Sequence, residues 1–366
     1  MTRTALARRL LTVFRRGPES PLADFEALAL DAFRYQFERN EPYRRYCERR
    51  GVVPDRIGTW TDAPAVPTAV FKETALACGP PDAAEAVFRT SGTSRGSEGR
   101  GTHYVLDLAL YREAALSSFR AFALPDGARL PMAILAPSAE RAPDSSLSRM
   151  LDWVRGAFGA PGSAEYVGEG GLRVGACLET LRRAAEDGPV FLLGTAFAFV
   201  HLLDAMAERG LRLRCPSGSR VMETGGLKGR SREVTREMLY AELSDRLGVP
   251  DVYIIAEYGM TEMCSQFYDS TLRKAVRGAA AGPRRLVPPA WVRTQVVDPD
   301  TLRPLPAGGV GLLRHFDLAN LNSVCALQTD DLGIAVADGF RVLGRALGAE
   351  ARGCSIAFDE WVSATR

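Results

Sequence analysis

The chain has 366 residues, of which 46% are hydrophobic and 25% charged, and its net charge at pH 7 is +2. This composition is ordinary for a globular protein with a sizeable core, and the near-neutral charge gives no general nucleic-acid-binding surface. The longest apolar run, 189–206, contains His201 and Asp204 and is too broken for a membrane span. Seven cysteines without a CxxC pair and three scattered histidines predict neither disulfides nor a zinc site. We therefore expect a cytoplasmic protein.

The N-terminal part is predicted to be helical and then extended. Its basic, amphipathic start is expected to be a surface helix, with a transit peptide as the alternative. Apolar residues recur at helical spacing over 23–50. Three prolines between 54 and 67 then mark an extended passage. A stretch rich in Gly, Ser and Thr covers 90–101, and 106–123 is predicted to be a helix.

In the middle of the chain, short apolar runs alternate with helical segments. The predicted strands are 129–138, 189–195 and 251–259, and the predicted helices are 145–159, 198–210 and 231–248. Ser231 and Glu233 are expected to begin the last helix, and Gly248 to end it. This order predicts an α/β protein with a largely parallel sheet, followed from about residue 285 by strands and turns without helices.

The stretch RTSGTSRGSEGRGTHY, residues 89–104, is suited to holding phosphate. Backbone amides and hydroxyls of such a loop can point at phosphate oxygens. It matches neither the GxxxxGK[ST] loop nor the GxGxxG dinucleotide fingerprint. A flexible surface loop without a ligand is the alternative.

Two further motifs carry groups that suit a nucleotide. EYGMTE, residues 257–262, directly follows an apolar strand, and ligands bind at the carboxyl ends of strands in open α/β sheets. Tyr258 could stack on a flat ring, Thr261 could bond a phosphoryl oxygen, and Glu262 could hold Mg²⁺. In QTDDLG, residues 328–333, the carboxylate of Asp331 could bond both hydroxyls of a ribose, and VLGR places Arg345 shortly afterwards.

The ordered set TSGTSRG, YGMTE, TDDLG and LGR, over residues 90–345, resembles the adenylate-forming superfamily, which includes acyl- and aryl-CoA ligases and firefly-type luciferases. The resemblance implies the large N-terminal α/β domain of that superfamily, with mixed and parallel sheets, and ATP and Mg²⁺ as its ligands. Residues that it assigns to the β- and γ-phosphates are Thr90, Ser91, Gly92, Thr93, Ser94 and Gly96. Residues that it assigns to the rest of the site are Gly225, Gly226, Tyr258 and Gly259 (adenine slot), Thr261 (α-phosphate), Glu262 (Mg²⁺), Asp331 (ribose) and Arg345 beside it.

The sequence departs from the usual pattern of that superfamily in three places. The common loop ends in lysine, whereas the nearest cation is Arg100. The usual acidic hinge residue after GR is replaced by Ala346 and Leu347. Only 21 residues follow Arg345, and none of them is lysine. We therefore expect the swinging C-terminal lid and its catalytic lysine to be missing.

The tail GRALGAEARGCSIAFDEW contains Cys354, between Gly353 and Ser355 and close to Arg352. A buried structural thiol is one interpretation, and an accessible thiol with thiolate character is the other. Nine residues span at most about 30 Å, so the thiol could return to an acyl phosphate beside the ribose. The tail, together with 40–51 and 66–73, resembles the acyl-protein synthetase of the bacterial bioluminescence fatty-acid reductase complex. That resemblance implies that Cys354 accepts the acyl group and passes it to a reductase.

These observations predict an enzyme that activates a carboxylic acid, expected to be a fatty acid, as acyl-AMP and then acylates Cys354. Thr261, Glu262 and Cys354 are the predicted catalytic residues. Transfer to CoA or a carrier protein is one alternative, and a non-catalytic nucleotide-binding scaffold is another. We expect an adenylate-forming domain over 1–340, with a β-rich part at 285–340, and a tail over 341–366. Residues 194–197, at the end of an apolar strand, could form part of the acid pocket, although a core position is expected for Phe197. His315 and Asp317 are candidates for the acyl site, and the other cysteines are expected to be structural.

Overall fold

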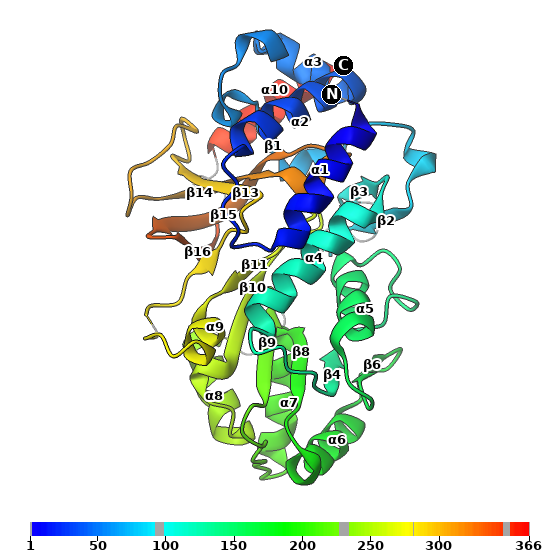
Figure 1. Ribbon diagram of the computed structural model, residues 1–366, viewed down its shortest axis with the longest axis vertical. Helices are drawn as coiled ribbons and strands as arrows, with labels where there is room; N and C mark the ends of the chain where they lie inside the picture. The colour runs from blue at the N-terminus through cyan, green and yellow to red at the C-terminus, as the bar shows by residue number, and fades with distance from the viewer. Residues whose placement is uncertain (1, 92–98, 227–233, 281, 347–351, 366) are drawn as a thin grey trace. The chain divides into compact units, whose positions relative to one another are not determined.

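The computed structural model describes residues 2–91, 99–226, 234–280, 282–346 and 352–365 (Figure 1). The chain forms two compact units. The terminal unit consists of Met1–Ser118, Met260–Gln266 and Val287–Arg366, and the central unit consists of Phe119–Gly259 and Phe267–Leu286. α4 (Leu108–Ala123) contains the first boundary between them. The fold is the α/β class that the sequence predicts.

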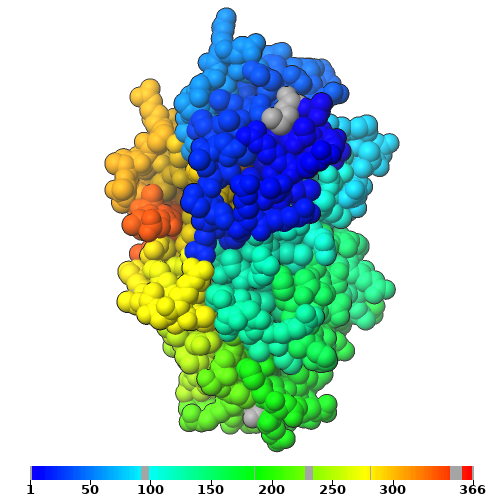
Figure 2. Space-filling view, viewed as in Figure 1, coloured from blue at the N-terminus to red at the C-terminus, as the bar shows by residue number. Residues whose placement is uncertain are grey.

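Three helices open the terminal unit: α1 (Arg3–Arg16), α2 (Phe25–Arg39) and α3 (Glu41–Arg49). α1 buries Leu6, Leu10, Val13 and Phe14, and Figure 2 shows the N-terminal residues, in blue, on the surface of this unit. The helical stretch predicted at 23–50 breaks at Asn40, whose side chain accepts a hydrogen bond from the Tyr43 amide. Pro42 stands in the first turn of α3, where a missing N–H costs no helical hydrogen bond.

Short elements then lead to the Gly-rich loop. They include η1 (Pro54–Arg56), η2 (Trp60–Asp62), β1 (Val66–Pro67), η3 (Thr68–Lys72) and η4 (Pro81–Ala83). β2 (Ala86–Arg89) and β3 (Thr102–Val105) pair antiparallel, with Arg89 opposite Thr102. The loop at 90–101 is therefore the connection of a hairpin.

The central unit is built on a parallel sheet in the order β5-β4-β8-β9-β10, with β11 added antiparallel to β10. Its longer strands are β4 (Met132–Leu135), β8 (Phe191–Thr195), β9 (Arg220–Thr224) and β10 (Ile254–Tyr258). Shorter ones are β5 (Ala164–Glu165), β6 (Val167–Gly168), β7 (Gly171–Leu172) and β11 (Phe267–Asp269). Buried aliphatic residues such as Leu192, Val221 and Ile254 form the core.

The helices of the central unit are α5 (Ser146–Phe158), α6 (Val174–Asp187), α7 (Ala196–Glu208), α8 (Arg236–Leu247) and α9 (Thr271–Val276). α8 begins later than predicted, because Thr235 is its N-cap and accepts a hydrogen bond from the Met238 amide. The predicted start, Ser231 and Glu233, lies outside the described residues. Gly248 ends α8 as predicted, with φ +68°, a conformation that favours glycine.

The terminal unit has a largely antiparallel sheet of β13 (Val292–Val297), β14 (Val310–Asp317), β15 (Ala326–Val336) and β16 (Gly339–Arg345). β1 adds to β15 in parallel. β12 (Leu286–Val287) lies at the boundary of the units, and η7 (Leu318–Asn320) connects β14 with β15. The largely parallel sheet predicted from the sequence is thus found in the central unit. β16 occupies the first residues of the expected tail.

A final helix, α10 (Arg352–Thr365), packs on α3 within the terminal unit (Figure 1). The Trp361 side chain is fully buried, and its ring centroid lies 4.9 Å from that of Tyr46. Its indole N–H donates to the Thr74 hydroxyl at 3.4 Å, and Arg50 pairs with Glu360 at 2.5 Å. None of the described helices is both long enough and apolar enough to pass through a lipid bilayer.

Candidate functional site

The predicted site residues fall into three groups. Those described in the terminal unit are Thr90, Ser91, Thr261, Glu262, Asp331 and Arg345. Those in the central unit are Gly225, Gly226, Tyr258 and Gly259. Gly92, Thr93, Ser94 and Gly96 lie outside the described residues. Cys354 is the third residue of α10.

The base of the Gly-rich loop is closed by hydrogen bonds between its two ends. The Thr90 amide donates to the Gly101 carbonyl at 2.9 Å, and the Gly101 amide donates to the Thr90 hydroxyl at 2.8 Å. Gly101 is closely packed: an added Cβ would lie 3.2 Å from Thr90 Cγ2, so the Thr90 side chain would have to shift slightly, and 3.4 Å from Phe71 Cβ. The Arg100 guanidinium donates to the carbonyls of Thr90 at 2.5 Å and Arg89 at 3.1 Å. Through these two hydrogen bonds, Arg100 stabilises the base of the loop.

Two buried side chains hold the backbone of Thr261 and Glu262. The imidazole Nδ1 of His103 donates to the Thr261 carbonyl at 2.7 Å, and Asn320 Nδ2 donates to the Glu262 carbonyl at 2.8 Å. Burial lowers the pKa of His103 to about 4, so the imidazole is neutral and carries its proton on Nδ1. His103 belongs to β3, so this contact joins the end of the loop to the YGMTE segment.

The Glu262 carboxyl group lies among three other charged groups of the terminal unit. Glu262 is only 9% exposed, and burial raises its pKa to about 7. The positive charges of Arg345 and Lys72 oppose this shift, and the negative charge of Asp331 adds to it. All three groups are therefore close enough to act on the Glu262 carboxyl group. Lys72 was not singled out from the sequence, because its only local signal is one lysine in a short turn.

Asp331 and Arg345 face each other on neighbouring strands. They are register partners of β15 and β16, and Arg345 Nε lies 3.6 Å from Asp331 Oδ1. The Arg345 side chain is 78% exposed, so this pair is worth little to stability and leaves the guanidinium accessible. The next amide, that of Ala346, donates to the Asp330 carbonyl at 2.8 Å.

In the central unit, the ETGG and EYG segments end the neighbouring parallel strands β9 and β10. Gly225 has φ +83°, a left-handed conformation that favours glycine, so the backbone turns at the end of β9. Gly225 and Gly226 are both exposed. Tyr258 is half-buried, and its ring centroid lies 5.7 Å from that of Phe267. An open backbone turn and a tyrosine ring are groups that can accept a flat base.

Two buried carboxyl groups precede these positions and were not singled out from the sequence. Glu223 is fully buried and is bonded by the Tyr240 hydroxyl at 2.8 Å and paired with Arg236 at 2.9 Å. Glu257 is 4% exposed, and the Thr224 hydroxyl donates to it. Burial raises the pKa of Glu257 to about 7. An acidic residue at the end of an otherwise apolar strand was the available signal.

Glu257→Gln is expected to stabilise the protein at alkaline pH and to leave its stability near pH 5 unchanged. Because the folded pKa of Glu257 is about 7 and the ordinary value is 4.5, the folded state binds the proton more tightly. Stability is therefore lost as pH rises from about 4.5 through 7, by at most about 3 kcal/mol. Urea unfolding between pH 5 and 8.5 measures this, with the exposed Glu186→Gln as control. Identical pH profiles for wild type and E257Q would contradict it.

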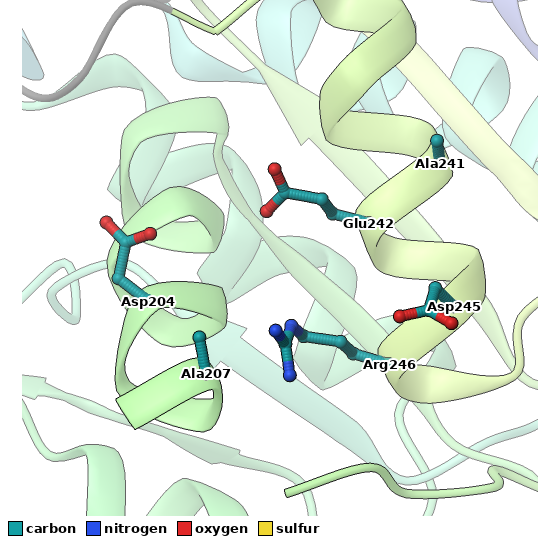
Figure 3. A pocket seen from close by; sticks show the side chains of 6 residues that line it. All are labelled: Asp204, Ala207, Ala241, Glu242, Asp245 and Arg246. Carbon is teal, nitrogen blue, oxygen red and sulfur yellow. The ribbon is translucent and has the colours of Figure 1, made fainter. Parts of the chain in front are cut away.

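A surface pocket of about 580 Å³ lies between α7 and α8 (Figure 3). Asp204 and Ala207 line it from α7, and Figure 3 shows Glu242 and Arg246 of α8 pointing toward α7. These residues lie in the second halves of both helices. Each helix follows a parallel strand and runs back along the sheet, so its second half lies near the amino ends of the strands. Thr224 and Tyr258 lie at the carboxyl ends. The pocket is therefore separate from the predicted adenine slot.

Several other predicted positions can now be placed. Phe197 is 37% exposed in the first turn of α7, so its prediction as a core residue was wrong. His315 and Asp317 are fully buried, and Asp317 accepts hydrogen bonds from the Ser265 hydroxyl at 2.6 Å and the Cys264 amide at 3.0 Å. The cysteines expected to be structural are all buried and free: Cys47, Cys78, Cys177, Cys215, Cys264 and Cys325.

Solved structures share this fold. The chain superposes on 2-hydroxyisobutyryl-CoA ligase in its postadenylation state, in complex with 2-HIB-AMP, with a TM-score of 0.66 and 17% identity, over 90% of this chain and 70% of that one. It superposes on an open conformation of the same ligase with a TM-score of 0.64 and 17% identity, over 90% and 77% of the two chains.

Curated relatives and a family model identify the family of the chain. The chain is 26% identical, over 84% of its own length and 78% of the relative, to the long-chain-fatty-acid–luciferin-component ligase of Vibrio harveyi. It is 24% identical, over the same shares, to the protein of that name from Aliivibrio fischeri. The family model described as acyl-protein synthetase, LuxE, matches residues 18–99 and 173–363, which is most of the chain. The chain is therefore a ligase that belongs to the LuxE family of acyl-protein synthetases.

Proposed function

We propose that this protein uses ATP to activate a long-chain fatty acid as acyl-AMP and then transfers the acyl group to its own Cys354. The observation that carries the proposal is the group of Glu262, Asp331 and Arg345 in one unit with the closed base of the Gly-rich loop. The printed names of the relatives, long-chain-fatty-acid–luciferin-component ligases, support a fatty acid as the substrate. The thioester would then be delivered to a partner acyl reductase in the cytoplasm.

The residues of the terminal unit fit the phosphates and ribose of ATP. Thr90 and Ser91 begin the loop that would receive the phosphates, and the Thr261 hydroxyl would bond the α-phosphate. Asp331 would bond the ribose hydroxyls, with Arg345 beside it. Glu262 fits Mg²⁺, because it is a desolvated carboxyl group and carboxylate oxygen is the ligand that Mg²⁺ prefers. Bound Mg²⁺ would supply charge neutralisation on the phosphate oxygens.

The first reaction is an in-line displacement at the α-phosphorus of ATP. A carboxylate oxygen of the acid forms the new P–O bond, and the bond between the α-phosphorus and the bridging oxygen of pyrophosphate breaks. The protein contributes alignment and charge stabilisation rather than a covalent bond. His103 and Asn320 bond the backbone carbonyls of Thr261 and Glu262, which supports a fixed backbone for those two side chains.

The second reaction moves the acyl group to sulfur. The Cys354 thiolate forms a bond to the acyl carbonyl carbon, the bond to the AMP oxygen breaks, and the thiol proton passes to solvent. Cys354 stands in the first turn of the 14-residue helix α10, where the helix dipole favours negative charge. A tethered nucleophile also has a high effective concentration.

The connection from the ribose-binding residues to Cys354 is short. Seven residues separate Ala346 from Cys354, so the eight Cα–Cα steps reach at most about 29 Å. Trp361 and Glu360 attach the other half of α10 to α3. We therefore propose an adenylate-forming domain over 1–340 and a tail, 341–366, that carries the acyl acceptor.

Acid-dependent turnover by the wild-type protein is the direct test. With Mg-ATP and a long-chain fatty acid, we expect exchange of pyrophosphate into ATP and a protein adduct of the acyl mass that neutral hydroxylamine removes. Exchange without an adduct, together with acylation of added CoA or carrier thiol, would replace Cys354 as acceptor. Thermal stabilisation by Mg-ATP without any release of AMP would instead indicate a non-catalytic scaffold and refute the proposal.

A further inference from the structure

Lys72 is unusual in this chain, in which only three of the 46 lysine and arginine residues are lysine. Of the other two, Lys228 lies outside the described residues and Lys274 belongs to α9 in the central unit. Lys72 is exposed at the end of η3, and it forms no hydrogen bond or ion pair with any residue that the structure describes. An ammonium group of this kind is available to a ligand.

The segment that carries Lys72 is packed against the base of the Gly-rich loop. Phe71 is 2% exposed, and its ring centroid lies 5.6 Å from that of His103. Phe71 also covers Gly101, where an added Cβ would lie 3.4 Å from Phe71 Cβ. His103 in turn bonds the Thr261 carbonyl, so Phe71 packs on the residue that links the end of the loop to the segment of Glu262.

Strand pairing holds the same segment beside the residues proposed to bind ribose. β1 directly precedes η3 and pairs with β15, with Pro67 opposite Gln328. β15 then continues to Asp331. On the other side, two residues after Lys72, Thr74 accepts the hydrogen bond from Trp361 of α10. Lys72 therefore lies among the loop, the YGMTE segment, the ribose strand and the helix of Cys354.

Two other described cations of this region, Arg100 and Arg345, already contact protein groups. Arg100 donates to the backbone carbonyls of Thr90 and Arg89, and Arg345 faces Asp331. The Lys72 charge is close enough to Glu262 to oppose the burial-driven rise of the Glu262 pKa. A lysine ammonium is a compact point charge with three donors, which suits phosphate oxygens.

We propose that Lys72 is a catalytic residue whose ammonium group binds the β- and γ-phosphates of ATP and neutralises the pyrophosphate that leaves during adenylation. This role rests on the proposed function. The ammonium keeps its proton throughout and forms no covalent bond, so the displacement at the α-phosphorus stays balanced as written above. The proposal also accounts for the missing lysine at the end of the loop, because the cation comes from a different segment of the chain.

Nucleotide affinity distinguishes this role from a structural one. Lys72→Gln is expected to raise the Kd for Mg-ATP by about tenfold to hundredfold, the loss of one charge-assisted contact. The Kd for AMP, which lacks both outer phosphates, should change less than twofold. Pyrophosphate exchange should fall in parallel with ATP affinity. Lys72→Arg, which keeps the charge, should restore most of the ATP affinity, and Lys274→Gln should match the wild type.

Each outcome decides the matter. Equal ATP affinity in K72Q and wild type would overturn the role of Lys72 while leaving the proposed function in place. An equal loss of ATP and AMP affinity would also overturn it, because the effect would then reach beyond the outer phosphates. If the wild type itself bound no ATP and exchanged no pyrophosphate, the proposed function would fail first. Isothermal titration of the full chain measures the affinities for Mg-ATP and AMP, and circular dichroism checks that each variant is folded.

Discussion

Glu262→Gln is expected to reduce acid-dependent pyrophosphate exchange by about 100-fold to 1,000-fold, the range for losing one preorganised electrostatic group. The substitution keeps the size of the side chain and removes the negative charge. The fold should survive, because Asn320 bonds the Glu262 backbone carbonyl rather than its carboxyl group. Exchange assays with purified wild type and E262Q at saturating Mg-ATP measure the loss.

The pH profile gives a second reading of the same residue. Burial raises the pKa of Glu262 to about 7, and Mg²⁺ binds the ionised carboxylate. Wild-type exchange should therefore rise as pH increases through about 7, and E262Q should lack this limb. Glu257 provides a matched control, because its buried carboxyl group has a similarly raised pKa but lies in the central unit. If the rise of exchange near pH 7 disappears in E257Q and persists in E262Q, the ionisation belongs to Glu257 and the prediction for Glu262 is wrong.

Cys354→Ala is expected to abolish acylation of the protein and to leave pyrophosphate exchange within about threefold of wild type. The two reactions are separable, because adenylation uses groups of the loop, the YGMTE segment and β15, whereas only the second reaction needs sulfur. Incubation with labelled fatty acid and Mg-ATP, followed by intact-mass analysis, measures the adduct. The measurement gives a nearly all-or-none signal.

Cys215→Ala is the control for that experiment. Its thiol is 8% exposed in the central unit, and burial raises its pKa to about 11, so we expect no acylation there and full labelling of the variant. Full labelling of C354A would remove Cys354 as the acceptor. Loss of exchange together with labelling in C354A would instead show that the tail supports adenylation itself.

Local patterns predicted the elements of the central unit well. Apolar runs and helix-end signals placed β8, α7 and β10 within a few residues, because each depends on neighbours in the sequence. The failures were also local in cause. The helical stretch at 23–50 breaks where Asn40 caps α3, and α8 begins at the Thr235 cap rather than at Ser231. In both cases a side-chain cap decides the boundary, which apolar periodicity does not report.

The burial of single residues was much harder to predict. Phe197 follows an apolar strand and yet is 37% exposed, whereas Glu257 ends an apolar strand and is 4% exposed. Their neighbours along the chain do not distinguish them. What covers each side chain comes from other elements, such as Thr224 of β9 against Glu257 of β10.

By itself, the sequence determined the chemical class of this protein. The ordered motifs from Thr90 to Arg345 and the cysteine in the tail are contiguous patterns, and a contiguous pattern can be read without knowing distances. Only the tertiary structure decided what Arg100 and Lys72 do. The Arg100 guanidinium bonds the loop's own carbonyls, whereas the Lys72 ammonium bonds none of the described residues and acts through its charge on Glu262. The reason is that a charge acts through space, and strand pairing and side-chain packing bring Glu262 close to Lys72 from a distant part of the chain.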